Sequence, residues 1–114
     1  MLMMTRATLI TLAFAAAAPA QQAQSTFIGV ITDSECSNAD HSKMRMDPTD
    51  PGCVKACISE HGASYVLYDS KTRTTYSLTD QKTPARFVGK RVIISGKLDA
   101  ATKTIRVAGI KPAS

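Results

Sequence analysis

The hydrophobic positions of this chain gather in five short runs, which polar, turn-forming segments separate. The first three runs are rich in β-branched and aromatic residues, and the last two alternate between apolar and polar positions. Both patterns are typical of β-strands. We therefore expect five strands, over residues 27–32, 65–68, 74–78, 91–98 and 104–107.

The same runs indicate where a strand bends and which side chains point inward. Gly29 lies in the middle of the first run, where a glycine often marks a bend or a bulge. In the fourth run, alternation places Val92, Ile94 and Leu98 on one inward face. In the fifth run, alternation places Ile105 and Val107 inward.

Two helical segments are expected between the strands. An irregular loop over residues 33–50 precedes a helix, with Asp50 as its N-cap and Pro51 at its first position. This helix ends at Gly62, a favoured residue just past a helix end. Residues 79–87 predict a short helix or a structured turn.

Five strands with a short helical element between the third and the fourth is the order of an OB-fold, a small Greek-key barrel. The longer helix is then an insertion between the first two strands. Closure of the barrel removes open strand edges, which invite aggregation. The sequence therefore predicts a mainly β fold, a five-stranded OB-like barrel over residues 26–112. An open meander covered by the longer helix is the alternative.

The N-terminal residues 1–20 have the three parts of a secretory signal peptide. Arg6 precedes an apolar stretch over residues 7–18, and small residues follow up to Ala20, after which we expect cleavage. The alternative is a membrane anchor, but a bilayer span needs about 20 apolar residues. We expect a periplasmic or secreted protein without a membrane span, which begins with a flexible leader over residues 21–25.

Charge and composition exclude several function classes. Loss of Arg6 with the signal peptide lowers the formal net charge from +5 to +4, which favours anionic partners only weakly. Export removes most nucleic acid from reach, so no nucleic-acid partner is expected. The sequence contains no Ser/His/Asp constellation, no HExxH motif, no phosphate-binding glycine loop and no CxxCH motif. We therefore expect a protein that is not an enzyme.

The chemically interesting residues form the pattern C-x4-H-x11-C-x3-C. Two of the cysteines and a second histidine recur every four residues, so they share one helix face, and the loop before the helix could fold back over it. Thiolates and imidazole suit zinc or Cu(I), and four such ligands close a tetrahedral site. The candidate metal ligands are Cys36, His41, Cys53, Cys57 and His61.

Two further residues bear on the metal, and one histidine has a simpler interpretation. Met44 and Met46 add thioethers near His41, which favours copper. His61 stands at a helix C-terminus, where a protonated imidazole interacts favourably with the helix dipole without any ligand.

A disulfide is the alternative use of the cysteines, because an exported domain folds in an oxidising compartment. Cys36 paired with Cys53 or with Cys57 would tie the loop to the helix, at a gain of about 3 kcal/mol. A bridge between Cys53 and Cys57 is also within reach. Each pairing leaves one thiol over. Thiol redox chemistry is a weaker option, because C-x-x-x-C is not the thioredoxin motif C-x-x-C.

Three tyrosines stand on the second and third predicted strands, where OB barrels often bind ligands. We consider Tyr65, Tyr68 and Tyr76 candidate partner-binding residues, of which one or two could offer a stacking surface.

The chain also resembles a known family along nearly all of its mature length. The resemblance rests on GVITDSEC at 29–36, His41, Met44, CVKAC at 53–57, GASYVL at 62–67 and GKRVIISGKL at 89–98. The family comprises small exported bacterial proteins of unknown function with an OB-like barrel. The resemblance implies this fold and export, and it implies no activity.

The sequence thus supports two functions. The first is an exported, non-catalytic binding module that holds zinc or copper in its Cys/His cluster. The alternative is a disulfide-stapled adaptor of the cell envelope that binds a protein or a glycan through the barrel face.

Overall fold

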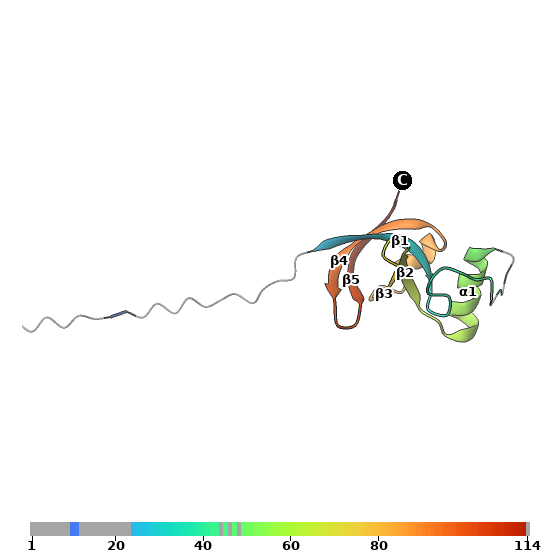
Figure 1. The fold of residues 1–114 in the computed structure, drawn as a ribbon, viewed down its shortest axis with the longest axis horizontal. Coiled ribbons are helices and arrows are strands. Elements are labelled where there is room, and N and C mark those ends of the chain that lie inside the picture. The colour runs from blue at the N-terminus through green and yellow to red at the C-terminus, as the bar shows by residue number, and fades with distance from the viewer. Residues whose placement is uncertain (1–9, 12–23, 44, 46, 48, 114) are drawn as a thin grey trace, which may run out of the picture.

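The structure is a computed structural model that describes residues 10–11, 24–43, 45, 47 and 49–113. Its regular elements are strands, one α-helix and one short 3₁₀-helix (Figure 1). In chain order they are β1 (Ser25–Asp33), α1 (Asp50–His61), β2 (Tyr65–Asp69), β3 (Thr74–Leu78), η1 (Thr83–Phe87), β4 (Arg91–Asp99) and β5 (Thr104–Pro112). The prediction of a mainly β, five-stranded fold is confirmed.

The sheet closes on itself because β1 has two antiparallel partners. Its first part, Ser25 to Val30, pairs with β4, and its second part, Val30 to Asp33, pairs with β2. β3 and β5 pair in parallel and complete the ring in the order β1-β2-β3-β5-β4. An open meander therefore does not describe this sheet.

The change of partner along β1 depends on a glycine. Gly29 packs so closely on β2 that a Cβ atom in its place would collide with the carbonyl oxygen of Tyr68. Only glycine permits this approach of two backbones. Gly29 adjoins Val30, the residue where β1 passes from β4 to β2. The bend that the sequence predicts at this glycine thus has a structural counterpart.

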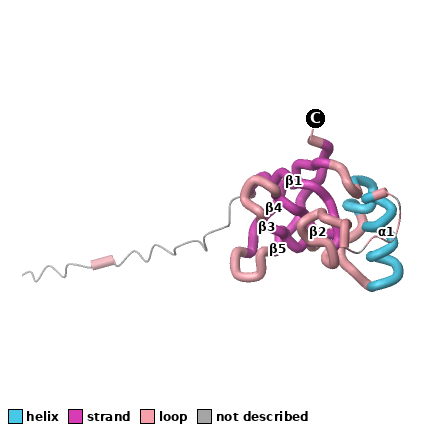
Figure 2. Tube along the Cα trace, turned by 45° about the vertical axis from the view of Figure 1, so that its right-hand side comes forward, coloured by secondary structure: helices cyan, strands magenta, loops and turns pink. Residues whose placement is uncertain are grey.

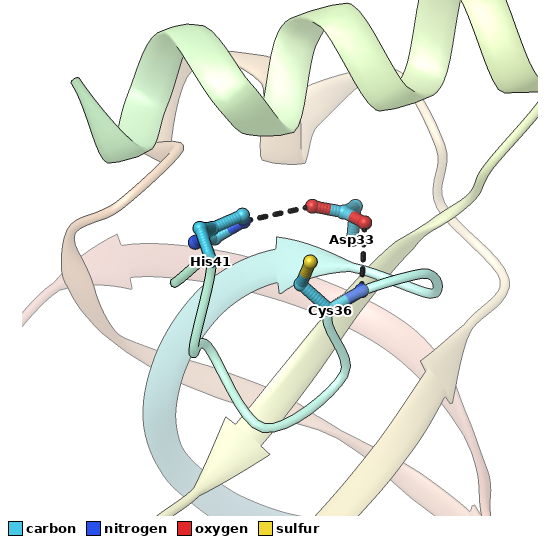
Figure 3. Close-up of side chains that lie close together, drawn as sticks. All are labelled: Asp33, Cys36 and His41. Atoms are coloured by element: carbon cyan, nitrogen blue, oxygen red, sulfur yellow. Dashed lines mark hydrogen bonds and ion pairs between the residues drawn. The ribbon is translucent and has the colours of Figure 1, made fainter. Parts of the chain in front are cut away.

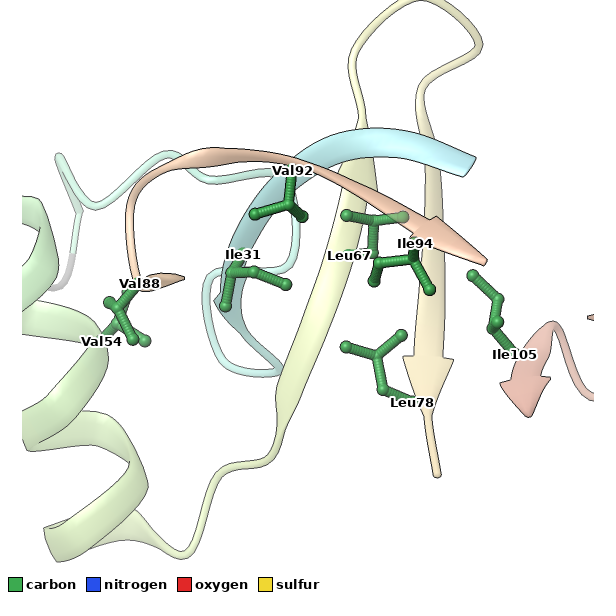
Figure 4. Packing of buried hydrophobic residues seen from close by; sticks show 8 residues of the cluster. All are labelled: Ile31, Val54, Leu67, Leu78, Val88, Val92, Ile94 and Ile105. Atoms are coloured by element: carbon green, nitrogen blue, oxygen red, sulfur yellow. The ribbon is translucent and has the colours of Figure 1, made fainter. Parts of the chain in front are cut away.

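The core fills the interior of the closed sheet (Figure 4). Inward positions of the strands supply most of it, as the alternation predicts, and Leu98 is half-buried at its margin. The helix adds one residue, Val54, which lies beside Val88 at the helix side of the core. The buried residues are Ile31, Val54, Leu67, Leu78, Val88, Val92, Ile94 and Ile105.

The helix lies on one side of the sheet, away from the β4–β5 turn (Figures 1 and 2). Helix placement differs in detail from the prediction. The N-cap is Thr49, whose side chain accepts a hydrogen bond from the N–H of Gly52, so Asp50 is already helical. Between β3 and β4, the expected helical stretch 79–87 contracts to a 3₁₀-helix that begins at Thr83.

Two strands are longer than the apolar pattern indicates. β5 continues to Pro112 because its end pairs with β4 through main-chain atoms, which need no apolar side chains. β1 begins at Ser25, a residue that we expected in the leader.

Apart from residues 10–11, the predicted signal peptide lies outside the described residues, as does its cleavage site. Met44 and Met46 also lie outside them. No helix in the described ranges is long and apolar enough to cross a membrane.

Candidate metal centre

The site begins where β1 ends, at a carboxylate that turns the chain. Asp33 Oδ1 accepts hydrogen bonds from the backbone N–H groups of Glu35 and Cys36, each at 3.0 Å. Thr32 Oγ1 donates a further hydrogen bond to the carbonyl oxygen of Cys36 at 3.1 Å. Aspartate commonly stabilises turns of this kind. The turn places Cys36 beside the carboxylate that forms it.

The loop then returns a histidine to the same carboxylate. His41 Nε2 lies 3.1 Å from Asp33 Oδ2, and the exposed fractions are 3% for His41 and 0% for Asp33. Asp33, Cys36 and His41 each offer one ligand atom, and these atoms lie within 4.8 Å of one another (Figure 3). The loop thus gathers a carboxylate, a thiol and an imidazole in a buried group.

Helix α1 runs over this group (Figure 3). The helix carries two further thiols. Cys53 and Cys57 are one helical turn apart, and both are fully buried. Beyond the effect of burial, the charge of Asp33 acts on the thiol of Cys57 and raises its pKa. The thiol of Cys53 interacts instead with the backbone of Asp47, at 3.0 Å from the oxygen and 3.3 Å from the nitrogen. Cys57 is therefore the helix thiol that we consider as a fourth ligand, and its Sγ lies outside the group of atoms within 4.8 Å of one another.

The electrostatics of the site oppose thiolates in the absence of a cation. Burial raises the pKa of Cys36, and the charge of Asp33 raises it further. Burial also raises the pKa of Cys57 to about 11, with a further contribution from the charge of Asp33. A thiol with a raised pKa is a poor nucleophile near neutral pH, so the thiol redox option gains no support. A cation in the site would reverse these effects.

The ligand candidates from the sequence divide into three groups. Cys36 and His41 group with Asp33, and the charge of Asp33 also acts on Cys57. Cys53 is buried nearby and engages Asp47. His61 is exposed in the last turn of α1 and is outside the grouped ligand atoms.

All three cysteines are free thiols in the structure. A negative charge on Cys53 would raise the pKa of both Cys36 and Cys57, which indicates that the three thiols lie in one region. Proximity of this kind serves either a shared metal ion or a disulfide.

Asp33 was missed by the sequence analysis. A single aspartate between a strand and a polar loop is read as a turn former, which it is. The signal that would have found it is its spacing, three residues before one candidate ligand, Cys36, and eight before another, His41.

A hollow with a volume of about 460 Å³ lies on the surface of the closed sheet, apart from this group. Tyr68 and Tyr76 line it, together with Lys71 and Arg91. The ring of Tyr76 packs against Phe27 with a centroid distance of 5.3 Å. Tyr65, the third candidate tyrosine, is outside this lining and packs against the core.

The fold and the site together define a small, mainly β protein with a buried group of side chains that could hold a metal ion. The chain belongs to the family described as "Protein of unknown function (DUF5818)", whose model matches residues 57–113. The match runs from Cys57 in α1 through β5, so the loop with Cys36 and His41 precedes it. No curated protein and no solved structure matches the chain. The expected membership of a family of unknown function is confirmed.

Proposed function

We propose that this protein is an exported, non-catalytic binding module that holds one zinc ion between Asp33, Cys36, His41 and Cys57. The observation that carries the proposal is the buried group of ligand atoms from Asp33, Cys36 and His41, all within 4.8 Å of one another. Zinc bonds to such ligands are about 2.0–2.3 Å long, so ligand atoms around one ion are roughly 3–4 Å apart. Small side-chain movements would bring these three atoms to that spacing.

The donor set favours zinc over copper. A carboxylate oxygen is a poor partner for Cu(I), which prefers thiolates and thioethers, whereas zinc accepts oxygen, nitrogen and sulfur. Asp33 is therefore the residue that distinguishes the two metals. Copper binding is the other outcome of a metal titration.

A closed ligand shell supports a binding role. Catalytic zinc sites have three protein ligands and leave one position to water or substrate, whereas structural sites have four protein ligands. The four residues proposed here fill the tetrahedral shell. Asp33, Cys36, His41 and Cys57 are all buried, which limits the approach of a substrate.

We also propose that the fold is an OB-like barrel and that the protein is exported. The parallel β3–β5 pair and the two partners of β1 support an OB-like barrel. The signal-like N-terminus supports export to the periplasm or beyond.

The test is a zinc titration of the purified, reduced protein in competition with a chromophoric chelator. We expect one zinc ion per chain and a loss of affinity of at least about 100-fold in His41→Ala and in Asp33→Asn. His61→Ala is the matched control, and it should bind zinc as the wild type does. Equal affinities for His41→Ala and His61→Ala would contradict the proposed site.

The hollow on the barrel favours a second candidate function, a disulfide-stapled adaptor that binds a glycan or a protein. Its volume of about 460 Å³ is in the range of ligand sites, and its two tyrosines offer aromatic surface. Cys36 with Cys53 or Cys57 would supply the staple. Soluble envelope glycans are the probe, and loss of their binding in Tyr76→Ala but not in Tyr65→Ala would support this function.

A further inference from the structure

The two ring nitrogens of His41 differ in their hydrogen-bond partners. Nε2 lies 3.1 Å from Asp33 Oδ2, a hydrogen-bonding distance. Nδ1 is buried and has no hydrogen-bond partner among the described residues. The carboxylate oxygen Oδ1 of Asp50 lies 3.8 Å from Nδ1. This distance is too long for a hydrogen bond.

A buried polar atom without a partner is rare in folded proteins and calls for an explanation. When a neutral imidazole donates its single N–H from Nε2 to Asp33, its Nδ1 is an acceptor. The carboxylate of Asp50 is an acceptor too, so the two atoms cannot form a hydrogen bond. In this tautomer, the position of the proton on Nε2 accounts for the unpaired Nδ1.

A metal ion bound to Nε2 would allow Nδ1 to form a hydrogen bond. A neutral imidazole that binds a metal through Nε2 carries its proton on Nδ1, and metal-bound histidines almost always donate that N–H to a carboxylate, a carbonyl or water. Asp50 stands where such an acceptor is needed. A movement of less than about 1 Å would shorten the distance to that of a hydrogen bond.

We propose that Asp50 is a positioning residue for the metal centre and accepts a hydrogen bond from His41 Nδ1 when the site is loaded. The inference rests on the proposed function. It adds a residue outside the ligand set and links the first turn of α1 to a ligand on the preceding loop. It also assigns Nε2 as the nitrogen that binds the metal.

Asp50 is itself held in place. Arg45 Nη2 lies 2.9 Å from Asp50 Oδ1, and the side chains are 45% and 56% exposed, respectively. An exposed pair of this kind contributes little to stability. Replacement of Asp50 should therefore leave the fold intact. The effect of the replacement on metal affinity can then be measured without a change in stability.

The experiment is a zinc titration of Asp50→Ala and Asp50→Asn, with Asp40→Ala as the matched control. The charge of Asp40 also acts on Cys36 and His41, but its hydrogen bonds go to Ser42. We expect a roughly 10–100-fold loss of affinity in Asp50→Ala. Asp50→Asn should lose less, because its amide oxygen still accepts a hydrogen bond. Asp40→Ala should change affinity by less than about fivefold.

NMR of the ¹⁵N-histidine-labelled protein reports which ring nitrogen of His41 carries the proton. A change in the overall charge around the site does not by itself alter that position. We expect the His41 proton on Nε2 in the zinc-free protein and on Nδ1 in the zinc-loaded protein. Circular dichroism establishes that each variant is folded.

The outcomes separate the inference from the proposed function. If the wild type binds no zinc, the proposed function fails and the inference fails with it. If the wild type binds zinc but Asp50→Ala matches Asp40→Ala, the inference alone is overturned. Zinc-loaded protein with the His41 proton still on Nε2 also overturns it.

Discussion

His41 and Asp33 form a buried pair, with 3.1 Å between Nε2 of the histidine and Oδ2 of the aspartate. One residue ends β1 and the other lies in the loop that follows, so the pair fastens the loop to the closed sheet. The same pair supplies two of the side chains proposed as metal ligands. The contact that holds the loop on the sheet is therefore also part of the proposed site.

Loss of this pair should destabilise the metal-free protein. His41→Ala leaves Asp33 Oδ2 buried without its partner, and we expect the free energy of unfolding to fall by about 2 kcal/mol. Urea denaturation with a chelator present measures this. His61→Ala, an exposed control, should change stability by less than about 0.5 kcal/mol. Equal stabilities of the two variants would show that the pair contributes nothing.

The N-cap assignment leads to a second prediction. Thr49→Ala removes the side-chain acceptor for the N–H of Gly52, and it should lower stability by about 1 kcal/mol. Thr72→Ala, in the exposed β2–β3 turn, is the control and should be nearly neutral. A larger effect in Thr72→Ala than in Thr49→Ala, as measured by thermal unfolding, would contradict the assigned cap.

A third prediction concerns two glycines. Gly29→Ala should lower stability by roughly 1–3 kcal/mol, because the new methyl group collides with the carbonyl oxygen of Tyr68. Gly109 also lies in a strand, but a Cβ there meets nothing within 4 Å. Gly109→Ala should therefore be neutral or slightly stabilising. Urea denaturation of the two variants tests this, and a reversed order would contradict the close approach of β1 to β2.

The stability of the metal-free protein should depend on pH because of the thiol of Cys57. Burial raises the pKa of this thiol from 9.0 to about 11 in the folded state. The unfolded chain therefore loses this proton first, and the stability from the neutral thiol, present below pH 9, is lost as pH rises towards 11. Unfolding curves between pH 8 and 11 should show this decline, with a shallower slope in Cys57→Ser. An unchanged slope in Cys57→Ser would rule out this thiol as a cause.

Much of the fold could be predicted because its signals are local. β-Branched runs and inward positions such as Ile94 indicate strands directly, and Gly62 ends the helix, as expected, with φ 64°. The N-cap could not be assigned from sequence, because Thr49 and Asp50 are both good caps and Pro51 fits either of the first two helical positions. The end of β5 was missed because main-chain pairing leaves no apolar pattern.

The site was only partly predictable, for a different reason. Spacing along the chain indicates which cysteines share a helix face, but it does not show which thiol turns towards the loop. In the structure the charge of Asp33 acts on Cys57, and the thiol of Cys53 engages the backbone of Asp47. The role of Asp33 depends on its burial at the end of β1, which a single polar residue does not reveal.

Native mass spectrometry of the exported, processed protein, with and without thiol alkylation, tests the central claim most directly. The account predicts a native mass that includes one zinc ion, and three alkylatable thiols once the metal is removed and the chain is denatured. A metal-free mass that is lighter by two hydrogens, with a single alkylatable thiol, would contradict the metal site and leave the disulfide-stapled adaptor as the better explanation.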